Sequence, residues 1–131
     1  MGTVINFTRA RHERHDTSEA NASAPHPSDT LSFVRRIPKK EGGGIDSWSL
    51  EASGSYTEQC EKGRRLAVEF LSYIGQYPNV GNVYLLSDIV ISIVEKARHG
   101  QECKGLYVGF FSLVGRYAMA TAVGMHGELN E

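Results

Sequence analysis

The stretch Lys104–Met125, KGLYVGFFSLVGRYAMATAVGM, decides how the fold of this chain is interpreted. Between Gly105 and Met125 its only formal charge is Arg116. The stretch predicts a helix over 104–124, with apolar residues on nearly all of its sides. A helix of that kind is typically covered on nearly all sides by other structure.

A membrane span is the first alternative for this stretch, because its length is sufficient and Gly105 with Gly109 forms a GxxxG pattern. Arg116 opposes that interpretation, since a central arginine costs about 2.5–3.5 kcal/mol on insertion scales. Four glycines and few leucine or isoleucine residues oppose it as well. We therefore expect a helix of a soluble domain, in which Gly109 and Gly115 allow another helix to approach closely.

A second helix is predicted over 57–76, ahead of the turn at Asn79–Asn82. Ser55 or Thr57 can cap its start, and Gly75 with Pro78 ends it. The residues expected to be buried are spaced three and four apart, namely Cys60, Gly63, Ala67, Phe70, Leu71 and Ile74.

A third helix is predicted over 83–99, with Gly100 as the residue that ends it. The β-branched run 89–94 leaves a strand as the alternative. The length of the segment and the basic residues at its end favour a helix. Its expected buried face consists of Leu86, Ile89, Val90, Ile93, Val94 and Ala97.

Together these elements predict an all-α fold, a small three-helix domain (helices about 57–76, 83–99 and 104–124) behind a largely disordered N-terminal arm. Residues 48–131 form the compact helical domain, with Trp48 and Leu50 packed against its core. Residues 1–47 form the flexible arm, which ends in a glycine-rich hinge at Lys40–Gly44.

The arm contains mostly small and polar residues, above all in the stretch Thr17–Thr30. Such a segment buries too little surface to offset the entropy lost on ordering. Thr3–Phe7 is β-prone and could join a sheet edge. Leu31–Pro38 is more apolar, and we expect it to lie as a strap on the domain, with a short linear docking motif as the alternative.

Composition limits the chemistry that this chain can perform. It has 131 residues, a net charge of −1 and two cysteines, Cys60 and Cys103, without a CxxC motif. No apolar leader opens the chain, so we expect reduced thiols and a cytoplasmic location. Ser112 lies in no nucleophile-elbow sequence and has no obvious general base. The spacing of the histidines does not indicate a set of metal ligands; they are His12, His15, His26, His99 and His126. We therefore expect that this chain is not an enzyme and that it binds neither a cofactor nor a metal.

The helix over 104–124 carries the functional hypothesis. A domain of about 70 residues has little capacity to bury one helix all round. Either the arm and the entry segment with Trp48 and Leu50 cover the outer face of that helix or a second chain does, and we favour self-association. The expected interaction surface is Leu106, Phe110, Phe111, Leu113, Val114, Arg116 and Tyr117.

Two charged residues interrupt apolar helices. Asp88 is expected on the polar side of its helix. Arg116 is expected to form a salt bridge, with Glu69 or Asp88 in the same chain as candidates, and an acidic group of a partner is the alternative.

The leading function is thus a non-enzymatic small helical interaction or regulatory module that self-associates through its apolar third helix. The alternative is a small DNA-associated regulator that uses the basic arm and the cluster Lys62, Arg64 and Arg65. The helix over 83–99 is too acidic to serve as a recognition helix, so nucleic acid is the less favoured partner and a membrane is not expected.

Overall fold

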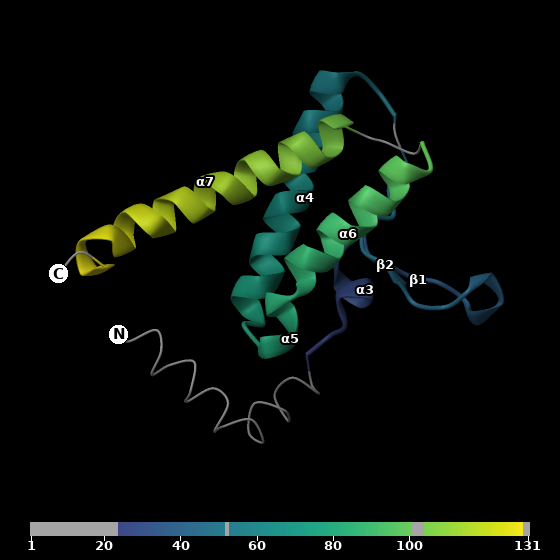
Figure 1. The fold of residues 1–131 in the computed structure, drawn as a ribbon, viewed down its shortest axis with the longest axis horizontal. Coiled ribbons are helices and arrows are strands. Elements are labelled where there is room, and N and C mark those ends of the chain that lie inside the picture. The colour runs from purple at the N-terminus through teal and green to yellow at the C-terminus, as the bar shows by residue number, and fades with distance from the viewer. Residues whose placement is uncertain (1–23, 52, 101–103, 130–131) are drawn as a thin grey trace.

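The computed structural model describes residues 24–51, 53–100 and 104–129. The predicted arm up to residue 23, including Thr3–Phe7, His12 and His15, and also Cys103 lie outside the described residues. The described chain is mostly helical, which confirms the predicted fold class (Figure 1). Its helices are α3 (Pro27–Thr30), α4 (Tyr56–Gln76), α5 (Val80–Val83), α6 (Leu85–Arg98) and α7 (Lys104–Leu129), and its strands are β1 (Arg35–Arg36) and β2 (Ile45–Asp46).

The helix ends follow local capping. Ser55 caps α4 as predicted, because its Oγ accepts a hydrogen bond from the backbone N–H of Glu58 at 3.2 Å. The turn predicted at residues 79–82 instead contains α5, whose first turn is capped by the Asn79 side chain. Gly100 follows the end of α6 with φ of +73°, a conformation that favours glycine. The last helix, α7, extends beyond the predicted end at residue 124 to Leu129.

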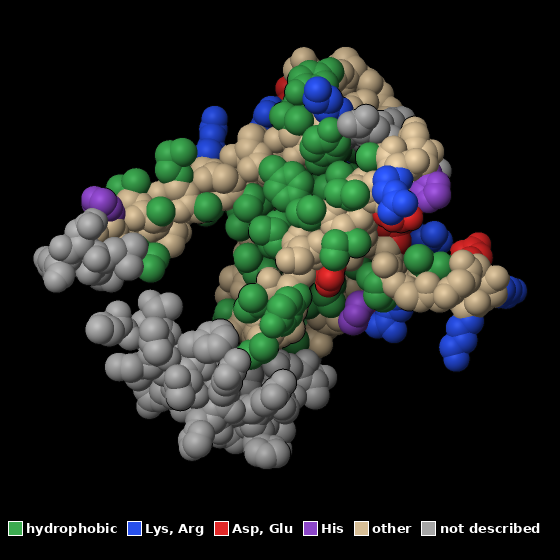
Figure 2. Space-filling model, in the orientation of Figure 1, with side chains coloured by type: hydrophobic (Ala, Val, Ile, Leu, Met, Phe, Trp, Pro, Cys, Tyr) green, Lys and Arg blue, Asp and Glu red, His purple; other side chains and the backbone are tan. Residues whose placement is uncertain are grey.

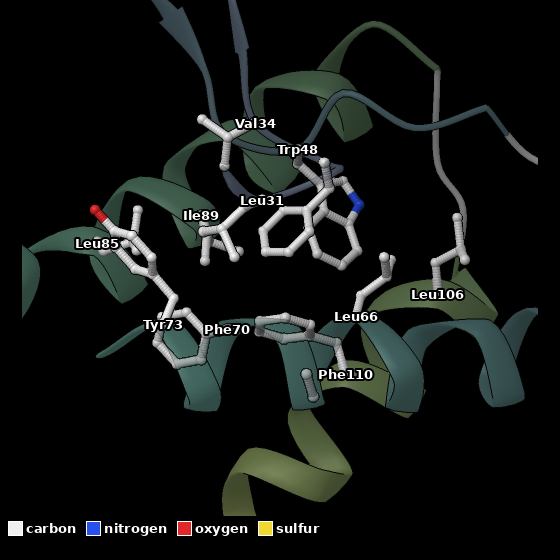
Figure 3. Packing of buried hydrophobic residues seen from close by; sticks show 12 residues of the cluster. Leu31, Val34, Trp48, Leu66, Phe70, Tyr73, Leu85, Ile89, Leu106 and Phe110 are labelled. Atoms are coloured by element: carbon white, nitrogen blue, oxygen red, sulfur yellow. The ribbon is translucent and has the colours of Figure 1, made fainter. Parts of the chain in front are cut away.

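The segment predicted as a strap contributes to the hydrophobic core. Leu31, Phe33 and Val34 are all buried. The ring of Phe33 meets Trp48 edge-on at a centroid distance of 5.6 Å and Phe110 at 5.7 Å. Figure 3 shows Leu31 and Val34 on the side of the core opposite α4. The core therefore starts within the segment that the sequence assigns to the arm, ahead of residue 47.

The glycine-rich segment is part of a β-hairpin rather than a hinge. Arg35 pairs with Asp46 and Arg36 with Ile45 in an antiparallel ladder. A 3₁₀ turn over Lys39–Glu41 and three glycines, Gly42–Gly44, connect the two strands. All three glycines have positive φ, which other residues rarely adopt. The three glycines therefore allow a tight turn of the hairpin and do not form the predicted hinge.

The chain before the strap is also held in place. Residues 17–30 are predicted to be flexible, yet the hydroxyl of Tyr73 donates a hydrogen bond to the carbonyl of Pro25 at 2.7 Å. His26 then caps α3 by accepting the N–H of Ser28. The prediction is wrong for residues 25–30 because hydrogen bonds, which composition does not reveal, hold this part of the chain.

The strap and the hairpin are bonded to two different helices. Glu69 of α4 accepts hydrogen bonds from both the N–H and the Oγ of Ser32, at 3.0 and 2.8 Å. Lys96 of α6 lies 2.7 Å from Asp46, and both side chains are mostly shielded from solvent. These contacts hold α6 against the hairpin while α4 carries the strap.

Those contacts also explain which face of α6 is buried. Leu85 and Ile89 are buried, and Ser92 and Lys96 follow them on the same side of the helix. Ser92 accepts the N–H of Ser47, so polar contacts turn this side inward. Val90 and Val94, predicted to be buried, are instead 42% and 52% exposed.

Glycines bring α4 and α7 into backbone contact. A Cβ on Gly63 would lie 2.8 Å from the backbone nitrogen of Phe110, and one on Gly109 would overlap the backbone of Cys60. The close approach predicted at Gly109 is therefore confirmed. The one predicted at Gly115 is wrong, since no described atom outside its own helix lies within 4 Å of the position of its Cβ.

Candidate functional site

The helix α7 divides into a packed first half and an exposed second half. Leu106 and Phe110 are buried against α4 and the strap. From Gly115 to His126 every residue is exposed, and Figure 1 shows this part projecting beyond the other helices. The segment Lys104–His126 is long and apolar enough to cross a membrane, and the most apolar part of it is only 17% buried.

The exposed half of α7 has two different sides. At 100° per residue, positions three and four apart share a side. One side lines a groove and carries no charge; it consists of Val114, Tyr117, Ala118, Thr121, Ala122 and Met125. The opposite side, which we call the outer side, contains Arg116, Met119, Ala120, Val123 and His126.

The groove has a volume of about 590 Å³ and lies between the projecting half of α7 and the body of the molecule. Its floor comes from α4, with Phe70, Leu71 and Ile74. Its far wall comes from α5 and α6, with Asn82, Val83 and Leu86. The amide nitrogen of Asn82 already donates to the carbonyl of Tyr77 at 2.8 Å. The groove is therefore suited to an apolar surface rather than to a charged ligand.

Further apolar side chains lie exposed on α5 and α6. Val83 is 70% exposed and Ile91 is 65% exposed, and Val90 and Val94 are also open to solvent. Figure 2 shows hydrophobic side chains gathered over the face of the molecule that is turned to the viewer. Contiguous apolar surface of this kind marks interaction sites on soluble proteins.

The structure separates the residues of the predicted interaction surface. Leu106 and Phe110 are buried within the chain, where Phe110 packs against Phe33, Trp48, Phe70 and Phe111. These two residues are thus core residues and are not available to a partner. Phe111, Leu113 and Val114 are half-buried, while Arg116 and Tyr117 are exposed.

The predicted interaction surface omits most of the groove-facing side of α7. Ala118, Ala122 and Met125 line the groove, and Thr121 lies among them. The available signal was the apolar run itself, which continues to Met125. The predicted surface ends at Tyr117, although the apolar run continues beyond it.

The charged residues singled out in the sequence are at the surface. Asp88 is exposed, as predicted for the polar side of its helix. The predicted salt bridge of Arg116 with Glu69 or Asp88 is not found among the described side chains, where Arg116 is exposed and Glu69 binds Ser32. The packed half of α7 ends before Arg116, which keeps its guanidinium away from the core.

Titratable side chains do not form a metal-binding group in the described parts of the chain, in which no three His, Cys, Asp or Glu residues converge. The pKa of Tyr56 is raised above its usual value. The largest cause is a hydrogen bond with the Cys60 side chain, followed by desolvation and the charge of Cys60. Tyr56 lies at the start of α4, away from the groove lining.

The predicted nucleic-acid residues lie on α4. Arg64 and Arg65 are exposed and Lys62 is half-buried. In the hairpin, Arg36 is paired with Asp29 at 3.4 Å. The basic residues of the arm up to Arg14 lie outside the described residues, so DNA binding stays a prediction from sequence.

No family model, curated protein or solved structure matches this chain. Its candidate site is therefore defined by its own geometry, an uncharged groove beside the exposed half of α7.

Proposed function

We propose that this protein is a non-enzymatic helical interaction module that self-associates through the second half of α7. One observation carries the proposal: the side of α7 from Tyr117 to Met125 is uncharged and exposed, and it lines an apolar groove. Soluble monomers seldom leave several hundred Å² of apolar surface bare. Association would remove this surface from water, which contributes roughly 25 cal/mol per Å² of apolar area.

Insertion across a membrane fits this geometry less well, although α7 is long and apolar enough by composition. Gly105 and Gly109 hold the first half of α7 in backbone contact with α4. The twelve residues Gly115–His126 are the exposed part of the segment Lys104–His126. They rise by about 18 Å at 1.5 Å per residue, whereas the hydrocarbon core is about 30 Å thick.

A matched pair of substitutions on α7 tests the proposal. Ala118 faces the groove and Ala120 is on the outer side of the same exposed helix. Ala118→Glu would place a carboxylate in the apolar contact, whose desolvation strongly disfavours association. Ala120→Glu introduces the same side chain and leaves the groove side unchanged.

Sedimentation velocity on the full chain is the measurement. We expect the wild-type chain and Ala120→Glu to associate, and Ala118→Glu to sediment as a monomer at the same concentration. Equal association of both variants would contradict the assignment of the contact to the groove side of α7. Circular dichroism is the control, and both variants should keep the helical content of the wild-type chain.

A further inference from the structure

We infer that the groove beside α7 receives the second half of α7 from a second copy of this chain, so that two chains fill each other's grooves. This inference rests on the proposed self-association and names its partner and contact. The occupant of each groove is the helical segment Val114–Met125 of the other chain.

The first argument is that insert and groove occur on one chain. The segment Tyr117–Met125 is exposed and also forms one wall of the groove. A two-fold interface uses the same patch on both subunits, so an apolar ridge beside an apolar groove satisfies this requirement.

The second argument is the shape of the groove-facing side. Ala118 and Ala122 are one turn apart at its middle, with Val114 and Met125 at its ends. Small residues at the middle allow two helix axes to approach to about 8 Å, the lower end of the usual range. The larger side chains at the two ends then fill the space above and below the crossing.

The third argument is charge. Every residue of α7 that lines the groove is uncharged, and so are the lining residues of α4, α5 and α6. Arg116 and His126 are on the outer side. Covering the groove side with another copy of the same uncharged surface therefore buries no ionised group, whereas a strongly charged partner segment would be desolvated without compensation.

The fourth argument is the exposure of both groove walls. Tyr117 on the groove side of α7 is 58% exposed, and Val83 on the opposite wall is 70% exposed. A second copy of the helix placed in the groove would cover both side chains.

Cross-linking between two chains that carry single cysteines at different positions tests the inference. In the full chain, Cys60→Ser and Cys103→Ser remove the native thiols. One chain then carries Val83→Cys on the far wall of the groove, and the co-expressed second chain carries Ala118→Cys on the groove side of α7. A short bis-maleimide links the two thiols, and mass spectrometry identifies the linked peptides. The matched control replaces Ala118→Cys with Ala120→Cys on the outer side.

We expect the Val83–Ala118 link to form several-fold more than the Val83–Ala120 link. Equal yields in a chain that associates would overturn the groove as the contact and leave self-association standing. If the wild-type chain and the chain without native thiols are both strictly monomeric, the groove contact and self-association are both overturned. A monomer that co-sediments with phosphatidylcholine–phosphatidylglycerol vesicles would assign the surface to lipid and likewise overturn the inference.

Discussion

Gly109 of α7 lies against the backbone carbonyl of Cys60 on α4, so closely that a methyl group on Gly109 would overlap it. Gly63 of α4 makes the reciprocal approach to the backbone of Leu106 and Phe110. These contacts fix the first half of α7 to α4 and leave the second half to project. The same packing that completes the core therefore creates the exposed helix on which the proposed function depends.

The glycine contact can be tested by adding one methyl group. Gly109→Ala should lower the free energy of unfolding by about 1–3 kcal/mol or more, because the clash is with backbone that cannot rotate away. Gly115→Ala is the control, since its Cβ would meet nothing within 4 Å, and better helix propensity should stabilise it by up to about 1 kcal/mol. Urea denaturation measures both, and a harmless Gly109→Ala would contradict the backbone contact.

The bond between strap and helix predicts a second stability change. Glu69→Ala removes the acceptor of two hydrogen bonds from Ser32, and the free energy of unfolding should fall by about 1 kcal/mol at this partly exposed site. Glu61→Ala removes a carboxylate from an exposed position of the same helix and should have a smaller effect. Equal effects of the two variants in thermal denaturation would indicate that the strap is not held through Glu69.

The ion pair between hairpin and α6 is suited to a double-mutant cycle. Lys96→Met and Asp46→Asn each remove one charge, while the asparagine retains an oxygen that can accept the N–H of Trp48. We expect a coupling free energy of about 1 kcal/mol, since both side chains are mostly shielded from solvent. A coupling energy of zero would show that the hairpin is not bonded to α6 in solution.

The raised pKa of Tyr56 predicts that the stability of the fold depends on pH in the alkaline range. Because the folded pKa lies above the unfolded one, any stabilisation from this group is present below the unfolded pKa and is lost as pH rises through the folded pKa. Cys60→Ala removes the largest cause, so the pKa of Tyr56 should fall towards its ordinary value near 10. Absorbance titration, with Tyr56→Phe to identify its contribution, measures the shift; an unchanged pKa in Cys60→Ala would refute the contact.

The helices were predictable because their patterns are local. Apolar spacing, Ser55 as a cap and Gly100 as a terminator each depend on residues within a few positions of one another. The hairpin was not predictable in this way, since its strands have two residues each and its pairing depends on contacts with α6. The apolar sequence around Phe33 predicts a strap, but the position of Phe33 beside Trp48 and Phe110 depends on tertiary packing.

The candidate site was predictable in kind but not in extent. The continuous apolar sequence of residues 105–125 indicated a helix that other parts of the chain or a second chain would bury. Sequence could not show that α4 and the strap cover Leu106 and Phe110 and that this cover ends before Gly115. The boundary between covered and uncovered halves is set by where α7 crosses α4, which is a property of the assembled helices.

The mass of the full chain in solution tests the central claim most directly. Sedimentation equilibrium over a wide range of concentration should give a mass that rises from the chain mass of 14.4 kDa towards twice that value. Such a rise is the behaviour of a dimer in reversible equilibrium with its monomer. A mass of 14.4 kDa at every concentration would contradict self-association through α7.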